Sequence, residues 1–190
     1  MRTVLMFSLV VLLTACATGS DGPARTLPSV GTQSTEVPVQ GGTLILEHPT
    51  EWKGDVSGVA VARTLTLQPR TAGGFEVLIT AFAGGTQLPD DAALARRVRQ
   101  QGEDLLPTAI QETVDLIPVK GPDTGGYLYH FTDRKPETGP GDFRELHQGL
   151  VVVGPLLLVV TILTHTGDSA TVKAAVDSIA GARYRPAVNH

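Results

Sequence analysis

The sequence predicts an α+β protein with a largely antiparallel β-sheet of six to seven strands, covered by helices on both faces. Three observations carry this prediction. Most apolar residues between positions 37 and 165 recur at every second residue, which is the period of a half-buried strand. Two segments, starting near residues 91 and 169, carry a narrow apolar stripe at helical spacing instead. Residues 155–163 are apolar in both strand phases and follow a turn, so this strand needs cover on both faces.

The composition is that of one globular domain plus a short extension. The 190 residues are 42% hydrophobic and carry a formal charge of −4 at pH 7. This mild acidity argues against a nucleic-acid partner, which usually requires a strongly basic surface. A single cysteine, Cys16, excludes a disulfide framework and a zinc site with several cysteines.

Residues 1–15 are predicted to be a lipoprotein signal peptide. Arg2 supplies a short positive region, and the apolar stretch 4–13 is too short to span a membrane. The motif Leu-Thr-Ala-Cys at residues 13–16 resembles the bacterial lipobox. This resemblance implies cleavage between Ala15 and Cys16 and acylation of Cys16 by a diacylglycerol and an N-acyl chain such as palmitate, which together make a stable anchor. The alternative is an ordinary cleaved signal followed by a free cysteine.

Residues 16–36 are predicted to form a flexible tether, because they are rich in Gly, Ser, Thr and Pro and show no apolar period. The folded domain is expected at 37–184, with a tail at 185–190. Ala17, rather than Asp, follows the cysteine, and the resemblance to Gram-negative lipoproteins then implies the outer membrane. We therefore expect a cell-envelope protein anchored to a membrane, on the periplasmic face of the outer membrane if the envelope has two membranes.

In the first half of the domain the pattern predicts strands at 37–46, 59–67 and 75–82 and a helix from Asp90 or Asp91 to about residue 106. Arg63 falls in the apolar phase of the second strand. It indicates either a bulge or an ion pair with an acid such as Glu47 or Glu76. The side of the helix opposite its apolar stripe carries three basic residues, which form either a solvated face or a patch touching lipid headgroups: Arg96, Arg97 and Arg99.

In the second half the period predicts strands at 114–119, 126–133, 143–153 and 156–165, forming an antiparallel meander with a tight turn at 154–155. The apolar strand that follows this turn is expected at the centre of the sheet. A second helix is expected from Asp168 or Ser169 to about residue 180, and Gly181 lies where a helix commonly ends.

The element order and a few residues resemble the Mog1/PsbP-like family, which includes PsbP, DcrB and LpqN-type lipoproteins. The resemblance rests on Pro49 and Trp52 after the first strand, Gly126-Tyr127 at the start of a later strand, and the hairpin at 149–161. It implies an α/β/α sandwich over residues 40–184. The family is functionally diverse and mostly non-enzymatic, so it says little about activity.

No catalytic motif is present: the sequence has no G-x-S-x-G, no phosphate-binding glycine loop and no H-E-x-x-H. We therefore predict no catalytic residues and no cofactor. His130, His147 and His165 lie on successive predicted strands. The turn at 154–155 places His147 opposite Ile162 and His165 opposite Arg144, on opposite faces of the sheet. The histidines are therefore not expected to converge on a metal.

Two groups of residues are candidate interaction surfaces. The loop 132–142 is rich in charge, proline and glycine, and its candidate contact residues are Asp133, Arg134, Lys135, Glu137 and Asp142. The loop is otherwise a mobile hairpin connection without a function. The second group consists of aromatic residues that form either core under a helix or the lining of a ligand groove: Trp52, Tyr127, Tyr129 and Phe131.

These observations predict a lipid-anchored envelope protein without catalytic activity that contacts another envelope protein. The alternative is a carrier or sensor that binds a small apolar or lipid-like ligand between sheet and helix. A third possibility is an enzyme whose site follows no known motif. A protein-contact function predicts a flat exposed patch, whereas a carrier predicts a pocket of several hundred Å³.

Overall fold

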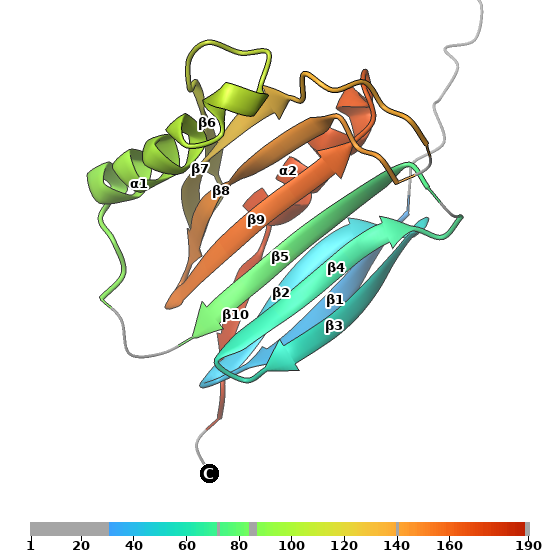
Figure 1. Ribbon diagram of the computed structural model, residues 1–190. Coiled ribbons are helices and arrows are strands. Elements are labelled where there is room, and N and C mark those ends of the chain that lie inside the picture. Colours follow the sequence, from blue (N-terminus) through green and yellow to red (C-terminus); the bar gives the residue numbers. More distant parts are fainter. Residues whose placement is uncertain (1–30, 72, 84–86, 140, 189–190) are drawn as a thin grey trace, which may run out of the picture.

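The computed structural model describes residues 31–71, 73–83, 87–139 and 141–188, and the predicted signal peptide and Cys16 lie outside them. The described residues form two antiparallel sheets and two α-helices (Figure 1). The smaller sheet has the order β1-β2-β10, from strands β1 (Thr32–Val39), β2 (Gly42–Pro49) and β10 (Arg183–Pro186). The larger sheet has the order β3-β4-β5-β9-β8-β7-β6. Its strands are β3 (Trp52–Val59), β4 (Ala62–Pro69), β5 (Phe75–Ala83), β6 (Leu116–Lys120), β7 (Thr124–Thr132), β8 (Glu145–Val153) and β9 (Leu156–Thr164).

The predicted four-strand meander is confirmed as β6 to β9, and β9 is the middle strand of the seven. The predicted register is also confirmed, because Val153 pairs with Leu156 and His147 with Ile162. Gly154 makes the turn with φ +54. The two apolar phases of β9 are explained by its place in the middle of the sheet, where one phase packs into the main core and the other against the smaller core under α1.

The N-terminal strands differ from the prediction. The single strand expected at 37–46 is a hairpin of β1 and β2, and Gly41 at its turn has the φ of +83 that favours glycine. Because β1 begins at Thr32, the tether does not reach residue 36 as expected. Strand β10 was not predicted either: it pairs with β2, so Arg185 and Pro186 belong to the sheet rather than to a tail.

The strand expected at 59–67 is also wrong, because the chain turns between β3 and β4 at Ala60 and Val61. Arg63 forms neither a bulge nor an ion pair. It lies opposite Gly58 and donates from Nη1 to the Gly58 carbonyl at 2.7 Å. The expected acids are engaged elsewhere: Glu47 binds Arg183, and Glu76 accepts from Gln68.

The helices begin where their predicted caps lie. Helix α1 (Asp91–Glu103) is capped by the Asp90 carboxylate, which accepts from the Ala93 amide at 2.7 Å, and α2 (Ser169–Ala180) is capped by Asp168. A 3₁₀ turn, Leu106–Thr108, follows α1 and starts at the predicted stop, where Pro107 withholds an amide.

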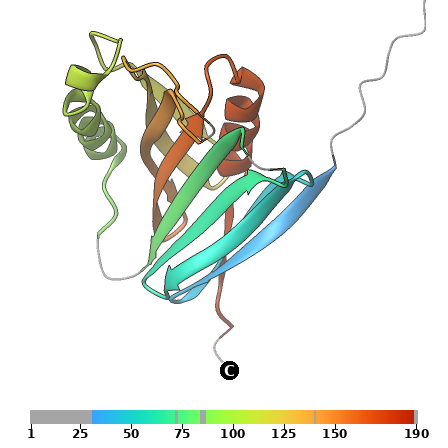
Figure 2. The same ribbon diagram turned by 45° about the vertical axis from the view of Figure 1, so that its right-hand side comes forward.

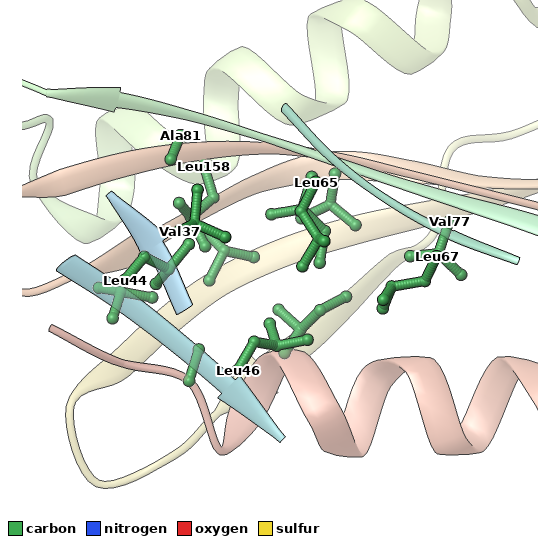
Figure 3. Close-up of a cluster of buried hydrophobic side chains, with 14 of the residues drawn as sticks. Val37, Leu44, Leu46, Leu65, Leu67, Val77, Ala81 and Leu158 are labelled. Atoms are coloured by element: carbon green, nitrogen blue, oxygen red, sulfur yellow. The ribbon is translucent and has the colours of Figure 1, made fainter. Parts of the chain in front are cut away.

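The main core lies between the two sheets and α2. Figure 3 shows Val37, Leu44 and Leu46 from the small sheet pointing toward Leu65, Leu67, Val77, Ala81 and Leu158 from the large sheet. Ala175 and Ile179 of α2 belong to the same core. No helix in the described part of the chain is long and apolar enough to cross a membrane.

A smaller core lies under α1, on the other face of the large sheet. Leu94 and Val98 of α1 pack there with Tyr129, Phe131 and Leu150. Figure 2 shows α1 on one side of the large sheet, with α2 and the small sheet on the other. The prediction of helices covering both faces is thus not confirmed as stated. A second sheet shares one face with α2, and α1 covers only part of the other.

Candidate functional site

A groove of about 910 Å³ lies beside α1, on the face of the large sheet that this helix only partly covers. Its floor comes from three neighbouring strands. Phe82 of β5 pairs with Leu157 of β9, and Val159 of β9 pairs with Leu150 of β8. All four side chains are apolar, and Phe82 is 44% exposed. The floor is therefore a continuous apolar strip across the centre of the sheet.

The groove exists because α1 packs over β7, β8 and β6 but not over β5 (Figure 1). Residues on the inner phase of β9, such as Leu158, are fully buried in the main core. Residues on its outer phase, Leu157 and Val159, are only half-buried. The sequence analysis expected cover on both faces of this strand. The incomplete cover on one face is what leaves the groove open.

One stripe of α1 forms the side wall. Ala93, Arg97 and Gln101 are four residues apart and so lie above one another along the helix. The neighbouring stripe, which includes Leu94 and Val98, fixes the helix to the sheet. The other lining residues are Gln87, Leu88 and Pro89 before α1, together with Gln40, Pro155, Leu156 and Tyr184.

The chemistry of the groove is apolar with a few polar groups. Three glutamines contribute amides, the Tyr184 hydroxyl is engaged with the Gly41 carbonyl at 2.5 Å, and Arg97 is the one charged residue among the described lining. Ligand-binding pockets of about 300–1,000 Å³ typically combine such an apolar surface with few orienting polar groups. The groove can therefore hold a small, largely apolar molecule.

The predicted aromatic groove is not formed. Trp52 is 4% exposed and packs on Phe75 with ring centroids 4.6 Å apart, in the main core. Tyr129 and Phe131 are buried on the opposite face, under α1. The four residues thus lie on two faces of the sheet because Trp52 faces inward from β3, while the phase of β7 points toward α1. Trp52, Tyr129 and Phe131 are core residues, which was the alternative left open, and Tyr127 is partly buried against the smaller core.

Tyr127 nevertheless ties the start of α1 to the sheet, whereas Tyr129 hydrogen-bonds within the sheet. The Tyr127 hydroxyl donates to the carboxylate of Asp91 at 2.9 Å, and this bond raises the pKa of Tyr127. The Tyr129 hydroxyl donates to Gln148 at 2.6 Å, and burial raises the pKa of Tyr129 to about 12. Both hydroxyls therefore act as neutral hydrogen-bond donors at physiological pH.

Sequence analysis missed Phe82, Leu157 and Val159 as site residues. Their signal was present, because β9 is apolar in both phases and Phe82 lies in the phase opposite Val77 and Ile79. It was interpreted as core, since sequence periodicity does not show how far a covering helix extends.

The predicted loop is exposed, as expected of an interaction surface, from Asp133 to Gly139. It is also held in place. The Glu137 carboxylate accepts from the Thr166 amide at 2.9 Å, and this bond lowers the pKa of Glu137. Asp142 accepts from Thr138, and Arg134 donates to the Ala109 carbonyl at 2.5 Å. Lys135 is exposed.

A second, smaller pocket of about 460 Å³ lies between α2 and the ends of β7, β8 and β9. His130 and His147, whose relative placement the sequence analysis did not address, are cross-strand partners whose rings stack at 4.4 Å. Glu145 contacts His130, whereas His165 lies elsewhere, beside Glu137. Burial, and then the charge of His130, lower the pKa of His147 to about 4. The described residues contain no group of three ligating side chains that could hold a metal.

No family model matches the chain, and no curated protein matches it. The structure is similar to the solution structure of cyanobacterial PsbP (CyanoP) from Synechocystis sp. PCC 6803. The match has a TM-score of 0.50 and 13% sequence identity, and covers 88% of this chain and 100% of the cyanobacterial one. At this identity the likeness concerns the fold alone. The chain therefore has the Mog1/PsbP-like fold that its element order predicted.

Proposed function

We propose that this protein is a non-enzymatic, lipid-anchored protein of the cell envelope that binds a small apolar or lipid-like ligand in the groove between α1 and the large sheet. The observation that carries the proposal is the partly exposed apolar strip of Phe82, Leu157 and Val159 on the two central strands. An uncovered apolar surface of this kind stays in contact with water unless something covers it.

The size and lining of the groove favour a ligand over a flat protein contact. Its volume of about 910 Å³ falls within the range of small-molecule sites, and its wall and floor come from different elements, which makes it concave. In the proposed helix–sheet–helix sandwich, α1 and α2 pack on opposite faces of the large sheet. A ligand in the groove would lie between the sheet and α1.

The proposed location in the cell envelope rests on the signal-like residues 1–15 and on Cys16. Acylation at Cys16 would hold the groove near a membrane, where apolar ligands are abundant. If the envelope has two membranes, the proposed location is the periplasmic face of the outer membrane.

Binding can be tested with N-phenyl-1-naphthylamine, a neutral dye that fluoresces in apolar sites. The full chain carrying Cys16→Ser avoids interference from the protein's own acyl chains. We expect saturable binding of about one dye per chain, weakened at least five-fold by Leu157→Gln. The matched control is Val59→Gln, because Val59 is 63% exposed and does not line the groove. The proposal would be contradicted if the dye showed no saturable binding, or if it bound the Leu157→Gln variant as tightly as the protein with Leu157.

A second candidate is contact with another envelope protein through the loop 132–142. The loop is exposed, charged and braced by Glu137 against Thr166, so a partner would not need to order it. Cross-linking from Lys135 in intact envelopes tests this candidate. A partner that cross-links to the native protein but not to the Glu137→Ala variant supports this candidate. A partner that cross-links equally to both proteins contradicts it.

A further inference from the structure

The charge of the groove points to a narrower class of ligand than its apolar floor does. No acidic residue lines it among the described positions, and Arg97 is its one charged side chain. Arg97 lies on the wall, one helical turn from Ala93 and one from Gln101. Arg97 is exposed and lines the groove, so its side chain lies where the groove meets solvent.

Among the described residues Arg97 has no hydrogen-bond or ion-pair partner, and the same holds for Arg96 and Arg99, the other arginines of α1. Within the described ranges, the other arginines outside α1 each donate to a backbone carbonyl or a carboxylate; these are Arg63, Arg70, Arg134, Arg144, Arg183 and Arg185. No such bond, and no carboxylate within 4.0 Å, is found for Arg97. The helix itself explains this, because the positions three and four residues from Arg97 are Ala93, Leu94, Gln100 and Gln101.

From these observations we infer that the groove binds a single-chain amphiphile with an anionic head, whose apolar chain covers the Phe82–Leu157 strip and whose head pairs with Arg97. This inference rests on the proposed function and names the class of its ligand. A guanidinium offers a planar pair of N–H donors that matches a carboxylate or a phosphate. A cationic head would meet repulsion at the same place, and a neutral head would leave the charge unpaired.

The test compares three ligands with the same chain: dodecanoate, dodecyl phosphate and dodecanol, each displacing N-phenyl-1-naphthylamine from the full chain carrying Cys16→Ser. Both anions have the expected head chemistry, and their ratio tells whether a carboxylate or a phosphate is preferred. Since Arg97 is exposed, we expect the preferred anion to displace the dye at a concentration up to about five-fold lower than dodecanol does. This preference should shrink in 0.5 M salt, where charges are screened within a few ångströms.

Arg97→Gln should remove the preference for the anions and leave dodecanol unchanged. Arg97→Lys should retain part of it. Arg96→Gln is the matched control, because it removes the same charge from the same helix at a residue that does not line the groove.

The outcomes separate the two proposals. If the dye binds but all three ligands displace it equally, or if Arg97→Gln and Arg96→Gln behave alike, the anionic-head inference is wrong and the apolar site stands. If neither dye nor amphiphile binds, the proposed function fails as well. Sedimentation showing that the groove closes by self-association instead would also overturn both.

Discussion

Phe82 on β5 and Leu157 on β9 are direct cross-strand partners, and both project onto the face of the sheet that α1 leaves uncovered. Their neighbours in the chain, Ala81 and Leu158, are also paired and are fully buried on the other face. The same two strands thus present a closed core on one side and an open apolar strip on the other.

This asymmetry predicts that truncating two adjacent leucines to alanine lowers the free energy of unfolding by different amounts. Leu158→Ala should lower the free energy of unfolding by about 2–5 kcal/mol, because it leaves a cavity in a fully packed site. Leu157→Ala should cost less, about 1 kcal/mol, because part of this side chain is already exposed to water. Urea denaturation measures both. Equal losses would mean that the outer face of β9 is packed as tightly as the inner one.

A pair of glycines tests how closely β7 and β8 approach. A Cβ at Gly149 would lie 2.0 Å from the Tyr127 carbonyl oxygen and 2.8 Å from the Leu128 Cα, which are backbone atoms that cannot move aside. Gly149→Ala should therefore destabilise the fold by several kcal/mol. The control is Gly125→Ala, since a Cβ there meets nothing within 4 Å. Its thermal midpoint should stay close to that of the native chain.

His147 predicts a dependence of stability on pH. The unfolded chain takes up a proton at this residue as the pH falls below about 6.5, whereas the folded protein resists until about pH 4. The contribution of His147 to stability is therefore complete above pH 6.5 and declines between pH 6.5 and 4. Between pH 7 and pH 5, we expect the free energy of unfolding to fall by about 1–2 kcal/mol less in the His147→Gln variant than in the native chain.

Other titratable and charged groups lie around His147, so the control is a histidine outside this pocket. His130 and Glu145 face it from the sheet, and Asp168, Lys173 and Asp177 line the same pocket from α2. Part of the slope should remain in the variant, because burial also lowers the pKa of His48. His165→Gln, beside Glu137, removes a histidine outside this pocket. If it flattens the profile as much as His147→Gln does, burial of His147 is not the cause.

Cys16→Ser should release the protein from membranes. The expected diacylglycerol is attached to this thiol and the expected N-acyl chain to the amino group of the same residue, and the apolar stretch 4–13 is too short to anchor the chain by itself. Fractionation of cell envelopes followed by immunoblotting measures the change, with the native chain labelled by radioactive palmitate as the reference. A variant that still sediments with membranes under high salt and carbonate would show that something other than Cys16 holds it there.

Local patterns predicted α1, the meander of β6 to β9 and α2 well, but not β10. The turn at Gly154 and Pro155, the two apolar phases of the following strand and the caps at Asp90 and Asp168 each depend on neighbouring residues, so periodicity and turn chemistry were sufficient. The N-terminal half was predicted less well. Its hairpins turn at Gln40-Gly41 and at Ala60-Val61. The glycine of the first turn was not taken as a turn signal, and the second turn carries neither glycine nor proline, so both were taken as parts of continuous strands.

The candidate site was harder to predict than the fold. Trp52 and the aromatic residues of β7 suggested a groove because their residue types suit one, yet they lie on opposite faces of the sheet. Phe82 and Leu157 look like ordinary core residues in sequence. Whether a side chain lines a core or a groove depends on what covers it, and the covering helix α1 ends more than 50 residues before Leu157 in the chain.

The sequence by itself determined the antiparallel meander, the central place of β9, the two capped helices and the likeness to PsbP-like proteins. These follow from spacing and turns within short stretches of chain. Only the tertiary structure decided that a second sheet shares the main core with α2, and that α1 stops over β8. The extent of that cover depends on how distant elements pack. It turns the outer face of β5 and β9 into an open groove with Arg97 at its edge.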